Sequence, residues 1–178
     1  MLHRLFTSVF ALALFLSLPA YAQDSGATLI DSSGAWSAYK YNDDQGGLVC
    51  FISSKPREME GNYQLRGEVW LQITHRQNPI SAANKTNVVS FTAGFRFFED
   101  SQPILQVGTE RFRMHTQDES AWSFPNEDAA LTRALRDGAE LTIESKSWRG
   151  TEIRDTFSLS GVTAMHNIIS QECGVDPL

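Results

Sequence analysis

Hydrophobic and polar residues alternate along much of the chain beyond residue 35. The clearest case is YQLRGEVWLQITHR, residues 63–76, where Val69, Leu71 and Ile73 share one face and Trp70 falls on the wetter face. A period of two residues is typical of a β-strand with one buried side. Similar runs rich in β-branched and aromatic residues bring the total to about eight strands. They lie within 35–41, 48–54, 87–98, 110–116, 139–148 and 151–159.

Two segments follow a helical period instead, and they predict a short helix near 127–137 and a C-terminal helix near 161–172. In the first segment Leu131 and Leu135 lie one turn apart, and Gly138 follows as a common helix stop. In the second, four apolar residues share one helical face: Val162, Met165, Ile169 and Cys173.

The order of these elements predicts a mainly β fold, because the strands do not alternate with helices as they do in βαβ proteins. We expect an antiparallel β-sandwich or a flattened barrel. Residues 35–178 contain no repeat and no linker, so they are expected to form a single domain. Residues 23–34 are small and polar and lack hydrophobic periodicity, which indicates a flexible lead-in.

The N-terminus has the pattern of a secretory signal peptide, residues 1–22. A basic start precedes the apolar run 5–18, and Ala20 and Ala22 form a small-x-small cleavage site before Gln23. A membrane anchor would need roughly 20 continuous apolar residues, and no later segment is long and apolar enough. We therefore expect a periplasmic or secreted protein of a Gram-negative bacterium, without a transmembrane segment.

The charge balance narrows the class of partner. The chain has 15 basic and 21 acidic residues, a net charge of -6. Removing Arg4 with the signal peptide makes the mature chain more acidic still. An acidic protein repels phosphate backbones and anionic lipids, so we expect neither nucleic acid nor an anionic membrane as the main partner.

The two cysteines, Cys50 and Cys173, are predicted to form a disulfide, because export delivers both to an oxidising compartment. In the chain-entropy model, closing so long a loop stabilises the fold by about 5 kcal/mol. The alternative is a nucleophilic thiol on Cys173 activated by His166. Seven helical residues separate these side chains by about 10.5 Å along the axis, which is too far for a hydrogen bond.

The histidines and the serines suggest no other chemistry. The spacing of His75, His115 and His166 matches no metal-binding motif, and we expect no metal or cofactor. A Ser-His-Asp set could be assembled from common residues, but the chain lacks the G-x-S-x-G motif of a nucleophile elbow.

One acidic residue lies where the strand pattern calls for an apolar one. Asp155 shares a face with Ile153 and Phe157, and a buried carboxylate needs a partner. Arg149 and Arg154 are the nearby cations. Asp155 is therefore interpreted as a structural charge that fixes the hairpin, with a ligand-binding carboxylate as the alternative.

Five segments together resemble the invasion-associated locus B family of exported bacterial proteins. They are VCFISSKP (49–56), AGFRF (93–97), SAW (120–122), SWRGTEIRDTFSLSG (147–161) and QECG (171–174). The resemblance runs through most of the mature chain in order. It implies a secreted or periplasmic β-rich domain, linked in pathogenic members to host-cell invasion, with no established catalytic residue or cofactor.

The leading functional hypothesis is a non-enzymatic binding or accessory protein of the bacterial envelope, with a protein or another envelope component as its partner. Exposed aromatic residues are enriched at binding hot spots. Three tryptophans are therefore the candidate anchors: Trp70, Trp122 and Trp148.

Two other classes of function stay open at this point. An envelope hydrolase would require Asp155 and His166 to converge in a pocket. A carrier of an apolar ligand would require a cavity inside the β scaffold, lined by Phe91, Phe95 and Phe97.

Overall fold

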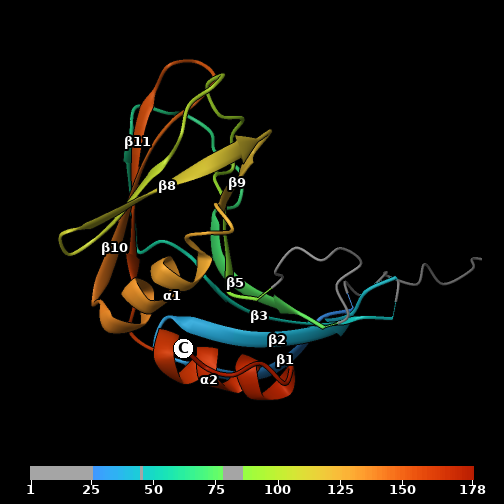
Figure 1. Ribbon diagram of the computed structural model, residues 1–178. Helices are drawn as coiled ribbons and strands as arrows, with labels where there is room; N and C mark the ends of the chain where they lie inside the picture. Colours follow the sequence, from blue (N-terminus) through green and yellow to red (C-terminus); the bar gives the residue numbers. More distant parts are fainter. Residues whose placement is uncertain (1–25, 45, 78–85) are drawn as a thin grey trace, which may run out of the picture.

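The computed structural model describes residues 26–44, 46–77 and 86–178, which contain eleven strands and two helices (Figure 1). The strands are β1 (Thr28–Ser33), β2 (Trp36–Asn42), β3 (Leu48–Ser54), β4 (Glu58–Gly61), β5 (Trp70–Arg76), β6 (Val88–Thr92), β7 (Ile104–Val107), β8 (Glu110–Gln117), β9 (Ser120–Ser123), β10 (Glu140–Lys146) and β11 (Glu152–Ser158). The helices are α1 (Asp128–Asp137) and α2 (Val162–Glu172). The predicted mainly β fold with two helices is confirmed. The predicted signal peptide lies outside the described residues.

All strands belong to one antiparallel sheet in the order β1-β2-β3-β5-β6-β9-β8-β7-β10-β11-β4, which is not closed into a barrel. β1 and β4 are its two edges. β8 joins two arms of the sheet, because residues 110–113 pair with β7 and residues 114–117 pair with β9. In Figure 1 one arm, with β1, β2 and β3, runs along the bottom, and β10 and β11 of the other arm rise on the left.

The sheet curls so that the inner faces of the two arms meet. Phe91 of β6 and Phe157 of β11 pack edge to face with ring centres 6.3 Å apart. The indole nitrogen of Trp36 in β2 donates a hydrogen bond to the backbone oxygen of Ser158 at 2.9 Å. Along β5 the burial alternates as the sequence predicts, with Leu71 and Ile73 inside. The apolar core therefore lies between the arms.

The two helices cover the inner face of the sheet where the arms diverge. α2 packs against β1, β2, β3 and β5, and α1 packs against β6 and α2. Gly161 begins the turn into α2 with φ +102°, and a Cβ atom there would lie 1.9 Å from the backbone oxygen of Ser33. Only glycine fits this contact, which brings the start of α2 against the end of β1.

The segment expected to be a flexible lead-in, 23–34, instead contains β1, which pairs with β2 from Thr28 to Ser33. Most β1 side chains are exposed, so the strand is held mainly through its backbone. A strand of this kind needs no hydrophobic alternation, which explains why the sequence pattern did not indicate it.

Candidate functional site

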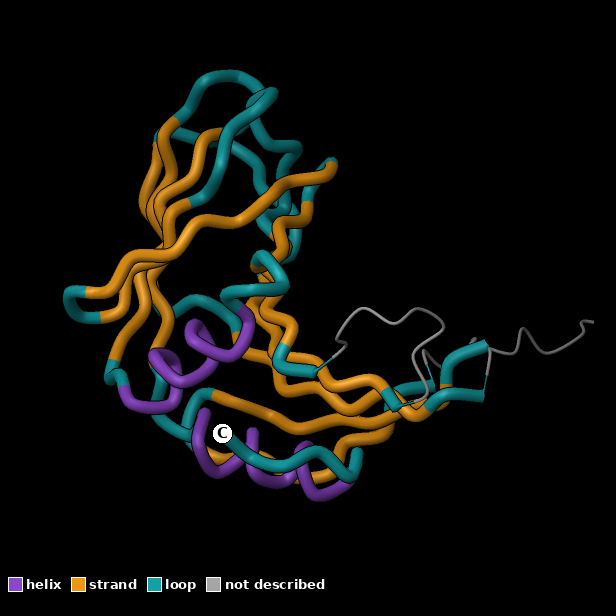
Figure 2. The backbone as a smooth tube through the Cα atoms, in the orientation of Figure 1, coloured by secondary structure: helices purple, strands orange, loops and turns teal. Residues whose placement is uncertain are grey.

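Three loops meet at the end of the molecule farthest from α2, where Figure 2 shows the teal segments gathered at the top. They comprise residues 62–69, 93–103 and 147–151. Backbone hydrogen bonds join them, from the nitrogen of Gly67 to the oxygen of Gly94 at 2.9 Å and from the nitrogen of Trp148 to the oxygen of Arg96 at 2.8 Å. These contacts hold the three loops together as one surface.

Each of these loops exposes one large apolar side chain. Leu65 is 95% exposed, Trp148 57% and Phe98 43%. We call these three residues and their surroundings the loop-end surface. Exposed apolar groups gathered at one place on a protein often mark an interaction site.

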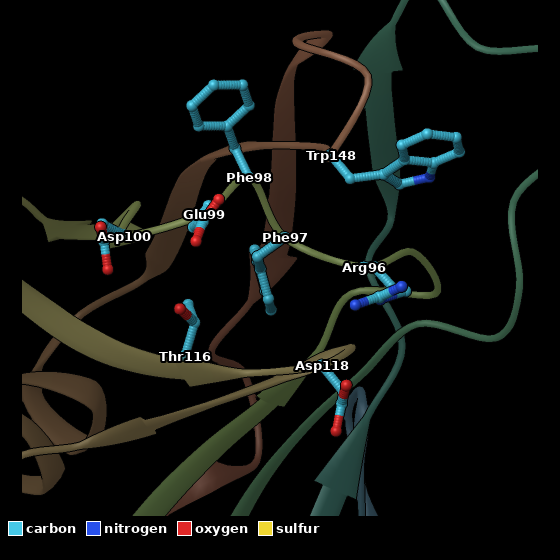
Figure 3. Close-up of a pocket in the computed structure, with 8 residues that line it drawn as sticks. All are labelled: Arg96, Phe97, Phe98, Glu99, Asp100, Thr116, Asp118 and Trp148. Atoms are coloured by element: carbon cyan, nitrogen blue, oxygen red, sulfur yellow. The ribbon is translucent and has the colours of Figure 1, made fainter.

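Trp148 separates two hollows on the loop-end surface. The first hollow has a volume of about 580 Å³, and Figure 3 shows Arg96, Phe98 and Asp118 among its lining residues. The second has a volume of about 590 Å³, and Leu65 and Phe95 contribute to its lining. Both volumes are within the range of small-ligand sites.

A buried ion pair lies behind the loop-end surface. The two terminal nitrogens of Arg66 donate to the two carboxylate oxygens of Asp155 at 2.6 and 2.7 Å, and Nε donates to the backbone oxygen of Ala93 at 2.7 Å. The Arg66 side chain is 4% exposed and that of Asp155 is fully buried. The guanidinium also lies 4.9 Å from the ring centre of Phe95. Arg66 thus ties two of the three loops to β11.

The partner of Asp155 differs from the sequence-based expectation. Neither Arg149 nor Arg154 reaches it: Arg149 stacks over Trp148 at 4.8 Å, and Arg154 faces Glu144 at 4.0 Å on the outer side of the hairpin. Adjacent residues of a strand point to opposite faces, so Arg154 could not share the inner face with Asp155. Arg66 is 89 residues away in the sequence, and no local pattern indicates such a contact.

The environment of Asp155 has two opposing effects on its ionisation. Burial raises the pKa of the Asp155 carboxyl, while the hydrogen bonds and the positive charge of Arg66 oppose that rise. The bidentate contact satisfies both carboxylate oxygens. The structural role predicted for Asp155 therefore fits its surroundings.

The other two candidate tryptophans lie on the outer face of the sheet. Trp70 is half-buried, with the ammonium of Lys55 4.4 Å from its ring centre. Trp122 is half-buried and stacks on His115 with ring centres 5.7 Å apart. Of the three candidates, only Trp148 is exposed on the loop-end surface.

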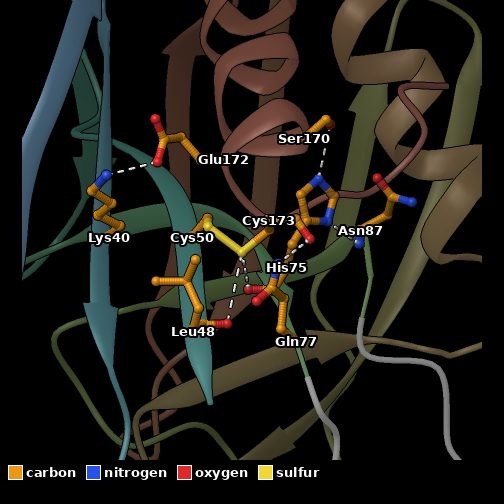
Figure 4. Close-up of a disulfide and its surroundings, with 9 residues drawn as sticks. All are labelled: Lys40, Leu48, Cys50, His75, Gln77, Asn87, Ser170, Glu172 and Cys173. Carbon is orange, nitrogen blue, oxygen red and sulfur yellow. Dashed lines mark hydrogen bonds and ion pairs between the residues drawn. A yellow bond between two sulfur atoms is a disulfide. The ribbon is translucent and has the colours of Figure 1, made fainter. Parts of the chain in front are cut away.

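A buried polar cluster lies between α2 and the sheet. The rings of His75 and His166 approach edge to face at 5.1 Å. Asn87 donates its backbone N–H to Nδ1 of His75 at 3.0 Å, and Nε2 of His75 bonds Ser170 Oγ at 3.1 Å (Figure 4). His166 bonds Oδ1 of Asn87 through Nε2 at 2.9 Å and Arg136 through Nδ1 at 3.3 Å. All four ring nitrogens thus have a partner.

These surroundings keep both histidines neutral at neutral pH. Burial lowers the pKa of His75 to about 4. Burial, and then the charges of His75 and Arg136, lower the pKa of His166 to about 3. The cluster is consistent with a structural role inside the fold.

The pair required for a hydrolase does not come together. Asp155 is bonded to Arg66 behind the loop-end surface, whereas His166 is bonded to Asn87 and Arg136 beneath α2. Both residues are fully buried.

The predicted disulfide between Cys50 and Cys173 is present, with the two Cα atoms 6.0 Å apart. It joins the end of α2 to β3 (Figure 4). The amide of Gln77 also donates to the backbone oxygen of Cys173 at 2.8 Å. With its sulfur in this bond, Cys173 does not offer the free thiol that the alternative interpretation needed.

The phenylalanines expected to line an apolar cavity pack on one another instead. The ring centres of Phe91 and Phe97 are 6.3 Å apart, and those of Phe95 and Phe97 are 5.5 Å apart. These three rings occupy space that a carrier would need to leave open for a ligand.

Two further findings concern ions and membranes. Within 26–44, 46–77 and 86–178, no group of three or more His, Cys, Asp and Glu side chains is placed to hold a metal ion. In the same part of the chain, neither helix has the length and apolar character needed to cross a membrane.

A family model described as Invasion associated locus B (IalB) protein matches residues 36–170. No curated protein and no solved structure matches the chain. The matched region includes the loop-end surface, the ion pair behind it and most of α2.

Proposed function

The chain belongs to the invasion associated locus B family, and from this premise we propose that it is an exported, non-enzymatic binding protein of the bacterial envelope. Its partner is a protein or another envelope component, held on the loop-end surface. As an accessory protein of this family, it contributes to contact with host cells.

The observation that carries the proposal is the exposure of Leu65, Phe98 and Trp148 on three adjoining loops. Exposing one large apolar side chain on each loop is costly in water unless the surface is covered part of the time. Tryptophan is also among the residues that contribute most to binding energy at interfaces.

The Arg66–Asp155 pair supports the same conclusion, because it holds the loops in place before a partner arrives. Loops that are already ordered lose less conformational entropy on binding than mobile loops do. The pair is buried and bidentate, as expected of a group that positions a surface without itself contacting the partner.

Export is supported by two features. The apolar N-terminal segment ends in a cleavage pattern. The Cys50–Cys173 disulfide suits an oxidising compartment.

A binding role also agrees with the state of the titratable groups. His166 and Asp155, the pair weighed for hydrolysis, are buried and bonded to separate partners. A general base must come within hydrogen-bond reach of a substrate proton. Neither side chain is open to such a contact.

The test is photo-cross-linking in living cells. A photoreactive amino acid is placed at Leu65 and, as a control, at Arg133, which is exposed on α1. We expect a reproducible adduct from position 65 that disappears with Trp148→Ala and persists with Trp70→Ala. Equal adducts from both positions, or an adduct at 65 that does not depend on Trp148, would contradict the proposal.

A further inference from the structure

We propose that the first hollow, on the Arg96 side of Trp148, is a saccharide-binding subsite for an oligosaccharide of neutral or amino sugars. The inference rests on the proposed function, because it names the chemical class of ligand that part of the loop-end surface takes. Four features of the hollow favour such a ligand: its aromatic rim, its unpaired charged side chains, its charge balance and its backbone.

Two exposed aromatic side chains, Trp148 and Phe98, stand at the rim of the first hollow (Figure 3). The ammonium of Lys146 lies 5.2 Å from the ring centre of Phe98, so Trp148 supplies the main ring face for stacking. A sugar ring has an apolar face of C–H groups that packs on the face of an aromatic ring, while its hydroxyls stay free at the edge. The guanidinium of Arg149 lies over the Trp148 ring at 4.8 Å. Arg149 lines the second hollow and not the first, so it leaves the first hollow open.

Four charged side chains of the first hollow have no partner among the residues that the structure describes. The side chains of Arg96, Glu99, Asp100 and Asp118 form no hydrogen bond or ion pair with any other described residue. They provide guanidinium donors and carboxylate acceptors around one space. A sugar hydroxyl donates and accepts at the same atom, so a ring of hydroxyls matches such a mixed set of groups.

The charge balance selects among sugars. Three carboxylates and one guanidinium line the first hollow, so the hollow repels an anionic ligand. A neutral sugar avoids this repulsion, and a protonated amino sugar is attracted. This excludes uronic-acid and sialic-acid polymers as the preferred ligand.

The backbone holds the first hollow in shape without a ligand. The backbone nitrogen of Phe97 donates to the backbone oxygen of Asp118 at 3.0 Å. The backbone nitrogen of Phe98 donates to the backbone oxygen of Lys146 at 2.9 Å. Phe97 is buried and forms the floor. A preformed site binds a small ligand without first having to be ordered.

Isothermal titration calorimetry of the purified full chain tests the inference with three tetrasaccharides. They are the tetramer of glucosamine, the tetramer of N-acetylglucosamine and the anionic tetrasaccharide of hyaluronan. We expect the first two to bind, and hyaluronan to bind at least roughly tenfold more weakly. Trp148→Ala removes the stacking surface and should weaken binding by roughly tenfold. Asp118→Asn should also weaken it, and the backbone φ of +53° at this position is one that asparagine tolerates.

Trp70→Ala is the matched aromatic control, because Trp70 lies on the outer face of the sheet and lines neither hollow; it should leave sugar affinity unchanged. Thermal melting checks that each variant folds, and Glu99→Gln replaces any variant that does not. The inference is overturned if no tetrasaccharide binds at millimolar concentration or if hyaluronan binds as tightly as the others. It is also overturned if neither Trp148→Ala nor Asp118→Asn changes the affinity for sugar. If no sugar binds but the cross-linked adduct at position 65 still forms, the saccharide assignment is wrong and the proposed function stands.

Discussion

We predict that the protein loses stability in acid, because burial lowers the pKa of both histidines of the buried pair. The pKa of His75 is about 4 in the folded protein and 6.5 when the residue is unperturbed. Because the folded value is the lower one, the unfolded chain takes up the proton first as the pH falls. The contribution of His75 to stability is therefore complete above about pH 6.5 and is lost between that pH and about pH 4.

The loss can be worked out from these two values. Each pKa unit corresponds to about 1.4 kcal/mol, so the difference between 6.5 and about 4 is worth about 3 kcal/mol for His75 alone. His166 acts in the same direction, since its pKa is about 3. A domain is typically stable by about 5–15 kcal/mol, so this loss is a large share of the total. Among the described residues, the hydrogen-bond partners of the two rings are Asn87, Ser170 and Arg136, and none of them is a carboxylate.

The assay is the free energy of unfolding in urea, measured from pH 7 to pH 4 for the wild type, His75→Gln and His115→Gln. His115 is exposed on β8 and serves as the matched control. We expect the wild type and His115→Gln to lose about 3 kcal/mol more than His75→Gln over this range. Parallel pH profiles for all three, or an NMR titration placing the pKa of His75 near 6.5, would refute the reasoning.

Three further predictions concern stability and processing. Asp155→Ala leaves the buried Arg66 guanidinium without its partner, and we expect the free energy of unfolding to fall by ~3–5 kcal/mol; a variant as stable as the wild type would contradict the tethering role. Reducing the Cys50–Cys173 bond, which joins residues 123 apart, should lower the melting temperature, with a loss of up to about 5 kcal/mol. Peptide mapping without reductant should recover one cross-linked pair, and two free thiols would count against it. Terminal sequencing of the exported protein should begin at Gln23, and a retained initiator methionine would remove the processing claim.

Elements with strong periodicity could be predicted from the sequence. The two helices lie within one residue of the expected bounds, because their apolar residues fall on one face. Four short strands were not anticipated: β1, β4, β7 and β9. Each has four to six residues, too few for a period to stand out. In β4 every side chain is exposed, so only its pairing with β11 defines it.

The site was predictable only in part. Trp148 and the disulfide follow from local features and from the cysteine count. The contacts that organise the site join residues distant in sequence, such as Arg66 with Asp155 and His75 with His166. Nothing near any of these residues in the sequence specifies its partner, because the curl of the sheet creates the first contact and the packing of α2 on β5 creates the second.

That curl also has a consequence for how the protein folds. β4 pairs with β11, Trp36 bonds Ser158, and α2 packs on β1. Segments near the N-terminus therefore cannot complete their native contacts until the last third of the chain has joined the fold. Contacts of such long range make folding slow, on the scale of milliseconds to seconds for β-rich domains. A fragment ending before β11 would leave Arg66 and β4 unpaired. We therefore expect such a fragment not to fold. In the whole chain, we expect native packing to form only after β11 and α2 have docked on the rest of the sheet.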